Sequence, residues 1–504
     1  MAQKYRPIMV VGTGSHVGKS VLVMGLCRWL NRRGLAVAPF KAQNMALNSG
    51  ITPEGGEIGR AQISQAEAAG IPAHPDMNPI LLKPTSDMGS QVIILGKVAG
   101  NYRAVDYYKL KPKLTKTVMA AFRRLRDQHQ VVVMEGAGSA AELNLKKHDL
   151  VNMSMAKRAG AAVILAADID AGGVFAQTIG TVRLLPKSER ELLAGIVINK
   201  FRGDPELFRE GIGIIEQKSG VPVLGLLPHF AGRLTLPQED GVALERGEMG
   251  TAPGSVRVGV VRLSHISNYT DADALAAEPG VEVRWISEPH QLAGLDLLLL
   301  PGSKSTISSL NGLRKNGLDQ AIIAYHAAGG HVLGLCGGYQ LLGLSVADPM
   351  GVEGPAGGVE RGLGLLPVET VMAGEKTTSL VTARAAAGLP FTVAGELNGY
   401  EIHMGQTTAI EKDRPALVLE KRLERALDLP EGQVSPDGRV VGSYLHGLLD
   451  NDALRAAVLA WAVGRGALAA PSDYGAFKER QYNLLADLLE ANLNLEGLLQ
   501  TLPA

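Results

Sequence analysis

The chain has 504 residues, too many for one ordinary hydrophobic core, so we expect two or more domains. Fifty basic and fifty acidic residues give a formal net charge of zero, which excludes a strong electrostatic attraction to nucleic acid or to an anionic membrane. The two cysteines allow no disulfide framework, the first residues show no signal peptide, and no apolar run is long enough to span a bilayer. We therefore predict a cytoplasmic α/β protein.

The first half of the chain alternates short apolar runs, typical of strands, with helical patterns. Helical patterns at 19–33 and 116–128 separate several of these runs. The alternation predicts an α/β domain whose parallel sheet is covered on both faces. The predicted strands lie at 8–11, 91–95, 131–134, 162–165 and 196–198.

A glycine-rich loop, Gly-Thr-Gly-Ser-His-Val-Gly-Lys-Ser at 12–20, follows the first predicted strand and opens the first predicted helix. In such a loop, backbone amides face phosphate oxygens, the lysine reaches the terminal phosphates, and the last hydroxyl binds Mg²⁺. The strict pattern has glycine where Thr13 stands, so this loop is a variant. The predicted nucleotide-binding residues are Thr13, Gly14, Gly18, Lys19 and Ser20, and Ser20 is also a predicted Mg²⁺ ligand.

The variant loop resembles that of the dethiobiotin synthetase-like family, which implies ATP as the nucleotide. Glu135 and Asp168 each follow a predicted strand, and parallel sheets bind their ligands at that edge. We expect both carboxylates to bind Mg²⁺, although each stretch is also of a kind that caps a helix or forms a turn. Asn199, in Asn-Lys-Phe-Arg-Gly-Asp, resembles the base-recognition segment of related nucleotide-binding proteins, which implies contact with adenine.

The alternating pattern breaks between the two halves of the chain. Residues 231–255 are rich in Gly, Pro and polar residues, which predicts a linker. A second α/β series then begins, with predicted strands at 256–261, 281–286, 297–300, 332–335 and 440–444. We therefore predict an ATP-binding domain at 1–230, the linker at 231–255, a second parallel-sheet domain at 256–450 and a helical tail at 451–504.

Cys336 stands in Gly-Leu-Cys-Gly-Gly-Tyr-Gln, after an apolar run and before a short helical pattern. A strand, a tight turn and a helix in this order lift one side chain out of the sheet and point a helix N-terminus at it, which favours the thiolate. A thiolate in such a position attacks carbonyl carbon in acyl transfer. We predict that Cys336 is a nucleophile rather than a small core residue.

A nucleophilic thiol needs a base and donors for the oxyanion. His446 follows a late strand, at the sheet end where the Cys336 turn opens, and is the predicted base. The predicted oxyanion donors are the amide of Gly302, in the turn Leu-Pro-Gly-Ser, and the amide of Gly337. His403, in Gly-Tyr-Glu-Ile-His-Met-Gly, either positions the substrate or is an ordinary loop histidine.

These segments resemble the class I glutamine amidotransferase domain over about residues 256–450. The resemblance implies that Cys336 hydrolyses glutamine and releases ammonia. Families with a complete triad carry Glu two residues after the histidine, where this chain has Leu448. A Cys–His dyad, or an orienting group from elsewhere in the chain, is therefore implied.

The order of the two domains and further segments resemble the cobyric acid synthase family nearly end to end. These segments include Lys-Ala-Gln-Asn-Met-Ala-Leu-Asn-Ser at 41–49 and the stretches at 78–84, 262–268, 300–306 and 399–403. The resemblance implies ATP- and glutamine-dependent amidation of the b, d, e and g carboxylates of (adenosyl)cobyrinic acid a,c-diamide in cobalamin biosynthesis. Residues 41–108 would line the corrin cleft, and Lys41 either binds phosphate or substrate or is a plain surface lysine.

Three other functions are alternatives to cobyric acid synthesis. The related a,c-diamide synthase shares both domains but carries a different sequence where this chain has 41–49. A partitioning-type ATPase switch usually has a second lysine where this chain has Gly12 and Thr13, and has no use for Cys336. A degenerate amidotransferase that scaffolds partners is disfavoured because Lys19, Cys336 and His446 are all present.

Overall fold

The computed structural model describes residues 3–86, 89–230, 234, 255–353, 356–410, 414–464 and 472–503. The internal contacts divide the chain into two compact units. Unit 1 comprises Met1–Ala46, Ile58–Leu236 and Lys478–Ala504, and unit 2 comprises Leu47–Glu57 and Pro237–Phe477. Of the predicted linker at 231–255, only Leu234 and Ser255 lie within the described residues.

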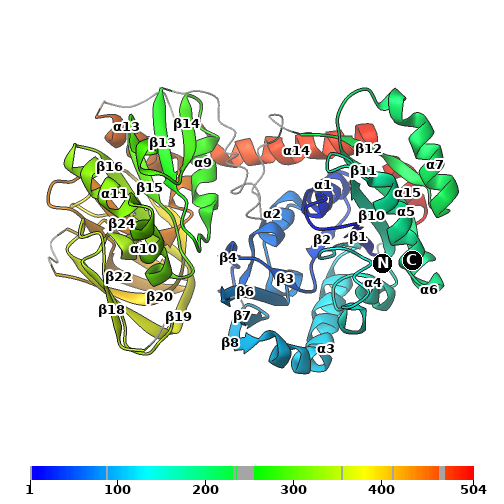
Figure 1. Cartoon of the computed structure of the whole chain (residues 1–504), viewed down its shortest axis with the longest axis horizontal. Helices are drawn as coiled ribbons and strands as arrows, with labels where there is room; N and C mark the ends of the chain where they lie inside the picture. The colour runs from blue at the N-terminus through cyan, green and yellow to red at the C-terminus, as the bar shows by residue number, and fades with distance from the viewer. Residues whose placement is uncertain are drawn as a thin grey trace. The chain divides into compact units, whose positions relative to one another are not determined.

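Unit 1 is built on a six-stranded parallel sheet, which confirms the predicted class of fold (Figure 1). The strands are β1 (Ile8–Gly12), β2 (Val37–Phe40), β9 (Val131–Glu135), β10 (Ala162–Asp168), β11 (Leu193–Phe201) and β12 (Val223–Pro228), in the order β12-β11-β10-β1-β9-β2. Every residue of β1, β2, β9 and β10 is buried, which explains their continuous apolar runs. The loops after these strands meet at the carboxyl edge of the sheet.

Alternate residues of β1 enter two separate cores. Met9 and Val11 face a core that includes side chains of α3 (Ala104–Gln128), α4 (Met153–Ala159) and α5 (Val174–Leu184). Ile8 and Val10 face the core shared with α1 (Lys19–Arg32), α14 (Tyr474–Asn492) and α15 (Leu495–Gln500). The sheet is therefore covered on both faces, and part of the predicted tail supplies one of the covers.

The predicted helical tail is divided between the units. α13 (Asp452–Val463) belongs to unit 2, whereas α14 belongs to unit 1 from Lys478 onward. α14 packs closely on α1, since a Cβ atom at Gly25 would lie 1.9 Å from Leu489 Cδ1. Tyr5 and Pro503, close to the two chain ends, form a β-bridge within unit 1.

The apolar run at 91–95 does not join the parallel sheet. It lies largely in β7 (Gly89–Ile94), which pairs antiparallel with β6 (Ile80–Ser86) and β8 (Lys97–Arg103), and β3 (Asn44–Met45) completes this small sheet. The prediction of a parallel strand there was wrong. A short apolar run indicates burial but carries no information on the direction of its neighbours.

Unit 2 contains a second sheet whose first five strands run parallel, again as predicted. The strands are β13 (Val256–Val261), β14 (Val281–Ile286), β15 (Leu297–Leu300), β16 (His331–Leu335), β24 (Val440–Ser443) and the antiparallel edge strand β23 (Gln433–Val434), in the order β14-β13-β15-β16-β24-β23. The short helix α12 (Gly337–Leu342) follows β16 directly. Cys336 therefore stands at the carboxyl edge of a central strand.

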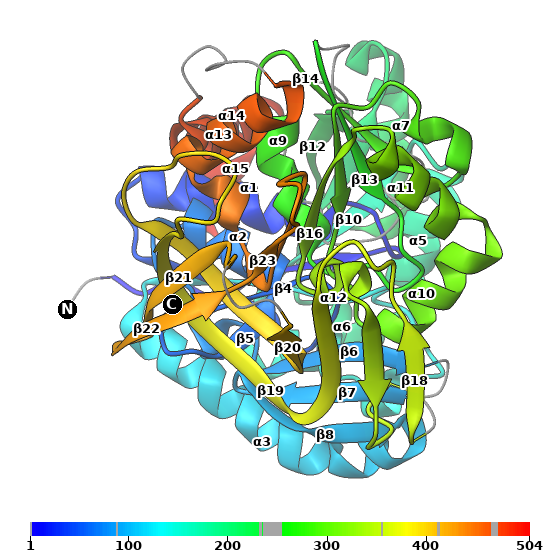
Figure 2. The ribbon, with the colours of Figure 1, turned by 90° about the vertical axis from the view of Figure 1, so that its left-hand side faces the viewer.

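A largely antiparallel sheet in unit 2 was not predicted. Figure 2 shows its two long strands, β19 (Val368–Ala385) and β20 (Leu397–Ala409), running side by side. The short strand β25 (Leu445–His446) pairs with β20, with Tyr400 opposite His446 and Glu401 opposite Leu445. This pairing attaches the predicted catalytic histidine to β20.

Candidate active sites

The glycine-rich loop of unit 1 lies between β1 and α1, in the predicted context. Gly18 has a φ of 91°, and a Cβ atom there would lie 2.2 Å from Asn199 Nδ2, so only glycine fits. Lys19 is buried, and its Nζ donates to the carbonyl oxygens of Gly14 at 2.9 Å and Gly138 at 3.1 Å. The amide of Thr13 donates to Ala166 O at 2.9 Å. The lysine is held across the loop, where a phosphate group would replace the carbonyl contacts.

Ser20 and Glu135 meet at the edge of the loop. Ser20 Oγ donates to Glu135 Oε1 at 2.8 Å, and Lys41 Nζ donates to the same oxygen at 2.8 Å. Gln65 Nε2 donates to Glu135 Oε2 at 2.6 Å. Burial opposes ionisation of this carboxyl, but the Lys41 ammonium and these hydrogen bonds hold the pKa of Glu135 below its usual range.

Lys41 is not a surface lysine, because it is only 6% exposed and forms an ion pair with the buried Glu135. A hydroxyl beside an ionised carboxylate is a donor set that suits a hard cation such as Mg²⁺. Among the described residues, no group of three or more His, Cys, Asp or Glu side chains has the arrangement of a metal site. Any Mg²⁺ bound here would therefore depend on few protein ligands, as is usual where phosphates complete the coordination.

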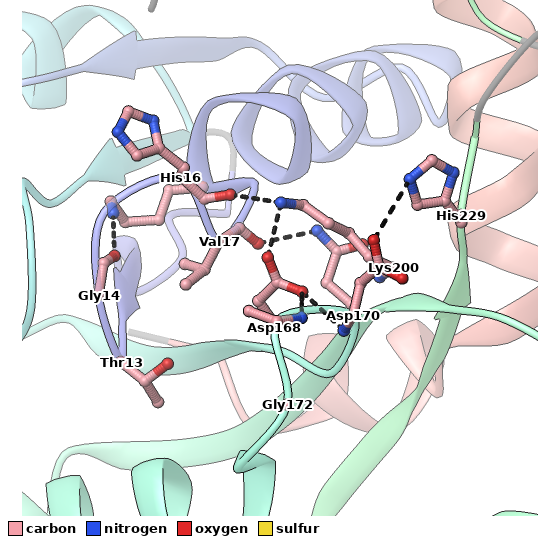
Figure 3. Close-up of polar contacts among 12 residues, drawn as sticks. Thr13, Gly14, His16, Val17, Asp168, Asp170, Gly172, Lys200 and His229 are labelled. Carbon is pink, nitrogen blue, oxygen red and sulfur yellow. Dashed lines mark hydrogen bonds and ion pairs between the residues drawn. The ribbon is translucent and has the colours of Figure 1, made fainter. Parts of the chain in front are cut away.

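Asp168 has hydrogen bonds on both carboxylate oxygens (Figure 3). Oδ1 accepts from the amides of Asp170 at 2.9 Å and Ala171 at 3.3 Å, and Oδ2 accepts from Lys200 Nζ at 2.6 Å. Lys200 Nζ also donates to His16 O, in the phosphate loop, at 2.7 Å. Asp168 is thereby connected to the loop through Lys200.

Asn199 and Lys200 together bind two consecutive carbonyl groups of the phosphate loop. Asn199 Nδ2 donates to Val17 O at 2.8 Å. Lys200 donates to His16 O (Figure 3). His16 and Lys200 have φ values of 59° and 61°, which are unusual for residues other than glycine. Asn199 was predicted from the sequence as a nucleotide-binding residue, whereas the adjacent Lys200 was not.

In unit 2, Cys336 occupies a sharp turn between β16 and α12. Its φ is 53° and its ψ is −108°, and its amide donates to Ser443 O on β24 at 2.8 Å. A Cβ atom at Gly338 would lie 1.9 Å from Leu300 O, so the helix approaches β15 too closely for any side chain. The Cys336 thiol is buried and donates to Ile402 O on β20 at 3.4 Å.

Cys27, the second cysteine, lies within α1 and is completely buried. Burial raises the pKa of its thiol, with a further contribution from the charge of Glu135. Cys27 therefore behaves as a core residue, in contrast to Cys336.

His446 forms a buried pair with Asp271, a residue that the sequence analysis missed. His446 Nδ1 lies 2.6 Å from Asp271 Oδ2, and the amide of Gly447 donates to Asp271 Oδ1 at 2.8 Å. Burial alone would lower the pKa of His446, but Asp271 and then Cys336 raise it to about 10. Asp271 therefore occupies the place of an orienting group for His446, for which the sequence offered no candidate because Leu448 stands where related families carry Glu. The only signal in the sequence is a carboxylate ten residues after the end of β13.

The turn at 300–303 lies against both Gly337, which follows Cys336, and His446. A Cβ atom at Gly337 would lie 2.5 Å from the amide nitrogen of Ser303, and one at Gly302 would lie 3.0 Å from His446 Cε1. The four residues predicted for acyl transfer, Cys336, His446, Gly302 and Gly337, are therefore brought to one place.

His403 lies on β20 rather than in a loop. Its ring stacks on Tyr444 with centroids 3.8 Å apart, and its Nε2 is 3.5 Å from Glu401 Oε1. Glu401 in turn accepts two hydrogen bonds from Arg422, at 2.7 and 2.9 Å. Burial opposes ionisation of the Glu401 carboxyl, but the hydrogen bonds from His403 and Arg422 hold the pKa of Glu401 below its usual range.

Comparison with known families identifies the class of both units. The model of the CobB/CobQ-like glutamine amidotransferase domain matches residues 257–454, and that of the CobQ/CobB/MinD/ParA nucleotide binding domain matches residues 8–239. The protein is thus an enzyme of the glutamine amidotransferase class with a nucleotide-binding domain in the same chain.

Individual relatives narrow this class to one family. The chain is 50% identical over 507 residues to the cobyric acid synthase of Syntrophobacter fumaroxidans, covering 98% of both chains. It is 48% identical to the cobyric acid synthases of Salmonella typhi and Citrobacter koseri, covering 97% of each chain. The chain belongs to the cobyric acid synthase family. In the described parts of the chain, no helix has the length and apolar character needed to cross a membrane.

Proposed function

We propose that the protein converts (adenosyl)cobyrinic acid a,c-diamide to (adenosyl)cobyric acid by amidating its b, d, e and g carboxylates with ATP and glutamine. The observation that carries the proposal is that one chain, matched over nearly its whole length by cobyric acid synthases, holds both a phosphate loop and a Cys336–His446–Asp271 arrangement. Two free cysteines support a cytoplasmic location.

In the glutaminase half, the Cys336 thiolate attacks the side-chain carbonyl carbon of glutamine. The amides of Gly302 and Gly337 bind the oxyanion that forms. The imidazolium of His446 gives its proton to the leaving nitrogen, the C–N bond breaks, and ammonia departs from a thioester. Water then hydrolyses the thioester, which releases glutamate and restores the thiol. Asp271 holds the imidazole ring and stabilises its charged form throughout.

In the ATP half, Lys19 and the amides of the loop bind the phosphates. The corrin carboxylate attacks the terminal phosphorus, which gives an acyl phosphate and ADP. Ammonia then displaces the phosphate, so that each amide formed releases one inorganic phosphate. Of the predicted cleft residues 41–108, Leu47–Glu57 belongs to unit 2. In this proposal residues 41–46 and 58–108 of unit 1 line the corrin cleft, with Lys41 beside the phosphate loop to meet phosphate or carboxylate oxygens.

We assign Mg²⁺ to Ser20 and Glu135, and it would neutralise phosphate charge there. Asp168 was also predicted as a ligand, but its oxygens already accept three hydrogen bonds from protein donors. The contact of Asn199 with adenine stays a prediction, and so does a role for His403 in holding glutamine.

Two alternatives have less support. The relatives named above are cobyric acid synthases and match both halves, which does not favour the a,c-diamide synthase. A partitioning-type ATPase switch has no use for the buried pair of His446 and Asp271 beside a cysteine.

Mass spectrometry of the corrin a,c-diamide after incubation with the protein, ATP, Mg²⁺ and glutamine tests the proposal. We expect a stepwise conversion of carboxylates to amides that stops after four. An unchanged corrin, with glutamate still released, would retain the glutaminase and reject the corrin substrate.

Two substitutions test the glutaminase half and the ATP half of the proposal separately. Cys336→Ala is expected to abolish glutamine-dependent synthesis and to leave synthesis from ammonium salts, because only the nucleophile for glutamine is lost. Lys19→Ala is expected to abolish both. Failure of ammonium to support Cys336→Ala, or near-normal turnover of Lys19→Ala, would contradict the respective assignment.

A further inference from the structure

The segment Leu47–Glu57 lies in the first half of the sequence but packs within unit 2. Its strand β4 (Ser49–Ile51) pairs with β5 (Glu57–Gly59), and β4 contacts both β19 and β20. The sequence on either side of the segment belongs to unit 1. Any division of the sequence into consecutive domains would therefore assign this segment to unit 1, although it packs in unit 2.

Buried polar contacts fix this segment in place. The amide of Ser49 donates to Asn268 Oδ1 at 2.9 Å, and Ser49 Oγ donates to Glu57 Oε1 at 2.8 Å. Glu57 also forms an ion pair with Lys376 of β19, with side chains only 1% and 7% exposed. Charged groups so deeply buried require their partners, so the segment is a built part of unit 2 rather than a loosely attached loop.

The segment supports the part of β20 that touches both predicted catalytic side chains. Ile51 packs in one buried cluster with Tyr400 and Ile402. The ring of Tyr400 stacks on His446, with centroids 5.3 Å apart and planes at 25°, and the carbonyl oxygen of Ile402 accepts the hydrogen bond from Cys336. The buried side chain of Ile51 thus lies against the two residues that hold the base and the nucleophile.

The opposite side of the imidazole is connected to the same segment. Asn268, which binds the amide of Ser49, is three residues before Asp271, which binds His446 Nδ1. Asn268 has a φ of 53°, an unusual conformation that the contact with Ser49 helps to hold. Leu47–Glu57 therefore contacts the stacking partner of His446, and through Asn268 it contacts the turn that carries the acid partner Asp271.

We propose that Tyr400 is a positioning residue for His446 and that Leu47–Glu57 is the element that holds Tyr400 in place. The glutaminase site is then incomplete without a segment encoded in the nucleotide-binding half of the sequence. The inference rests on the proposed hydrolysis of glutamine at Cys336. Lys41 precedes the segment in the sequence but belongs to unit 1, where its ammonium binds Glu135 beside the phosphate loop.

Substitutions at Tyr400 in the full-length protein test the positioning role. Tyr400→Leu removes the stacked ring, and because small displacements of a catalytic group cost up to about a hundredfold in rate, we expect the glutaminase kcat to fall at least about tenfold. The KM for glutamine should change little, and synthesis from ammonium salts should continue. Tyr400→Phe keeps the ring and should restore the glutaminase rate to within about twofold of the original.

Ile51→Ala tests the segment itself, with Leu292→Ala as its matched control. Both residues are buried in unit 2, but Leu292 lies in the short helix at Pro289–Leu292, which packs against α11 (Leu318–Ala327). We expect Ile51→Ala to lower the glutaminase kcat and Leu292→Ala to lower only the thermal midpoint.

Three results would overturn the inference. They are an unchanged kcat in Tyr400→Leu, equal losses in Ile51→Ala and Leu292→Ala, and a parallel loss of ammonium-dependent synthesis. Absence of glutaminase activity in the unsubstituted protein would instead reject the proposed function.

Discussion

Single side chains determine the charge of the glutaminase base. Asp271 lies on Nδ1 of His446 and, together with Cys336, raises the pKa of the imidazole to about 10 despite complete burial. The ring is therefore protonated at neutral pH, and in the proposed mechanism it gives this proton to the leaving nitrogen. A carboxylate that comes 175 residues earlier in the chain thus sets the state of the histidine.

Asp271→Asn is expected to lower the glutaminase kcat by roughly 10²-fold or more, because an amide that donates to Nδ1 favours a neutral ring in the wrong tautomer. It should also lower stability in a pH-dependent way. A histidine pKa raised from 6.5 to about 10 adds stability that is complete below pH 6.5 and is lost as the pH rises through 10. The difference in thermal midpoint between the two proteins should therefore shrink from pH 7 to pH 10. A difference independent of pH would contradict the pairing.

Lys200 holds the phosphate loop in place through its hydrogen bond to His16 O. Hydrogen bonds that involve a charged group are worth about 1.5–3 kcal/mol, so Lys200→Met should raise the KM for ATP by roughly 10- to 100-fold in ammonium-supported synthesis. The exposed Lys218 of α7 (Arg209–Ser219) provides the control, since Lys218→Met should change nothing.

Asp168→Asn distinguishes two roles for Asp168. If Asp168 acts through Lys200, the increase in the KM for ATP caused by Asp168→Asn should not add to the increase caused by Lys200→Met. The Mg²⁺ concentration that gives half of the full activity should then stay the same. A large increase in that concentration would show that Asp168 binds the metal after all.

The residue types of the two sites could be predicted from the sequence, but their partners could not. Gly18, Lys19, Ser20 and Cys336 lie in contiguous motifs whose spacing carries the chemistry. Asp271 and Lys200 act on residues far along the chain, through contacts that only the folded sheets create. Lys41 was left undecided for the same reason, because its partner Glu135 is 94 residues away.

At the level of elements, close packing of backbone explains the glycines around Cys336. α12 lies directly on β15, with Gly338 against Leu300 O, and a Cβ atom at Gly334 would lie 2.4 Å from Leu342 Cδ1. These contacts hold the turn in the strained conformation that presents the thiol.

Gly338→Ala should therefore be destabilising by about 3 kcal/mol, because the carbonyl it would meet belongs to a buried strand and cannot move freely. Gly180→Ala on α5 is the matched control. A Cβ atom there meets nothing within 4 Å, and alanine favours a helix by about 1 kcal/mol, so the control should be neutral or stabilising. Chemical unfolding of both variants measures the difference, and equal midpoints would contradict the packing argument.

The parallel strands β1, β9, β10 and β15 could be predicted because each is a fully buried apolar run. β2 and β12 also belong to the parallel sheet of unit 1 but were not among the predicted strands. The antiparallel strands β19 and β20 were missed because they are half-exposed, with burial that alternates along much of each strand. Their sequences carry many Thr, Gly and charged residues, so they lack the continuous apolar runs by which the other strands were predicted.

At the scale of the whole molecule, neither unit is a continuous stretch of sequence. Unit 1 needs Lys478–Ala504, and unit 2 needs Leu47–Glu57. Composition and turn residues mark where a chain changes character, but they do not reveal that a short segment returns to an earlier core. The domain boundaries predicted from the sequence divide it into consecutive stretches, so they could not assign these two segments to the correct units.

The last helices should stabilise unit 1 in a measurable way. Leu485 of α14 is completely buried in the core shared with α1, so Leu485→Ala should lower the free energy of unfolding by about 2–5 kcal/mol. Leu484, its neighbour, is 39% exposed, and Leu484→Ala should cost far less. ATP should raise the free energy of unfolding of the unsubstituted protein and of both variants by the same amount, because a ligand that binds the folded unit stabilises it. Equal losses in the two variants would exclude a core role for this helix.

The late position of Lys478–Ala504 sets an order of events during synthesis on the ribosome. Every segment of unit 2 has been translated before this stretch appears, so unit 2, which carries Cys336, can close first. The ATP-binding unit, although most of it precedes unit 2 in the sequence, must wait for Lys478–Ala504 to supply one cover of its sheet. A prematurely terminated chain would therefore lack a finished ATP-binding core, whatever the state of the other unit.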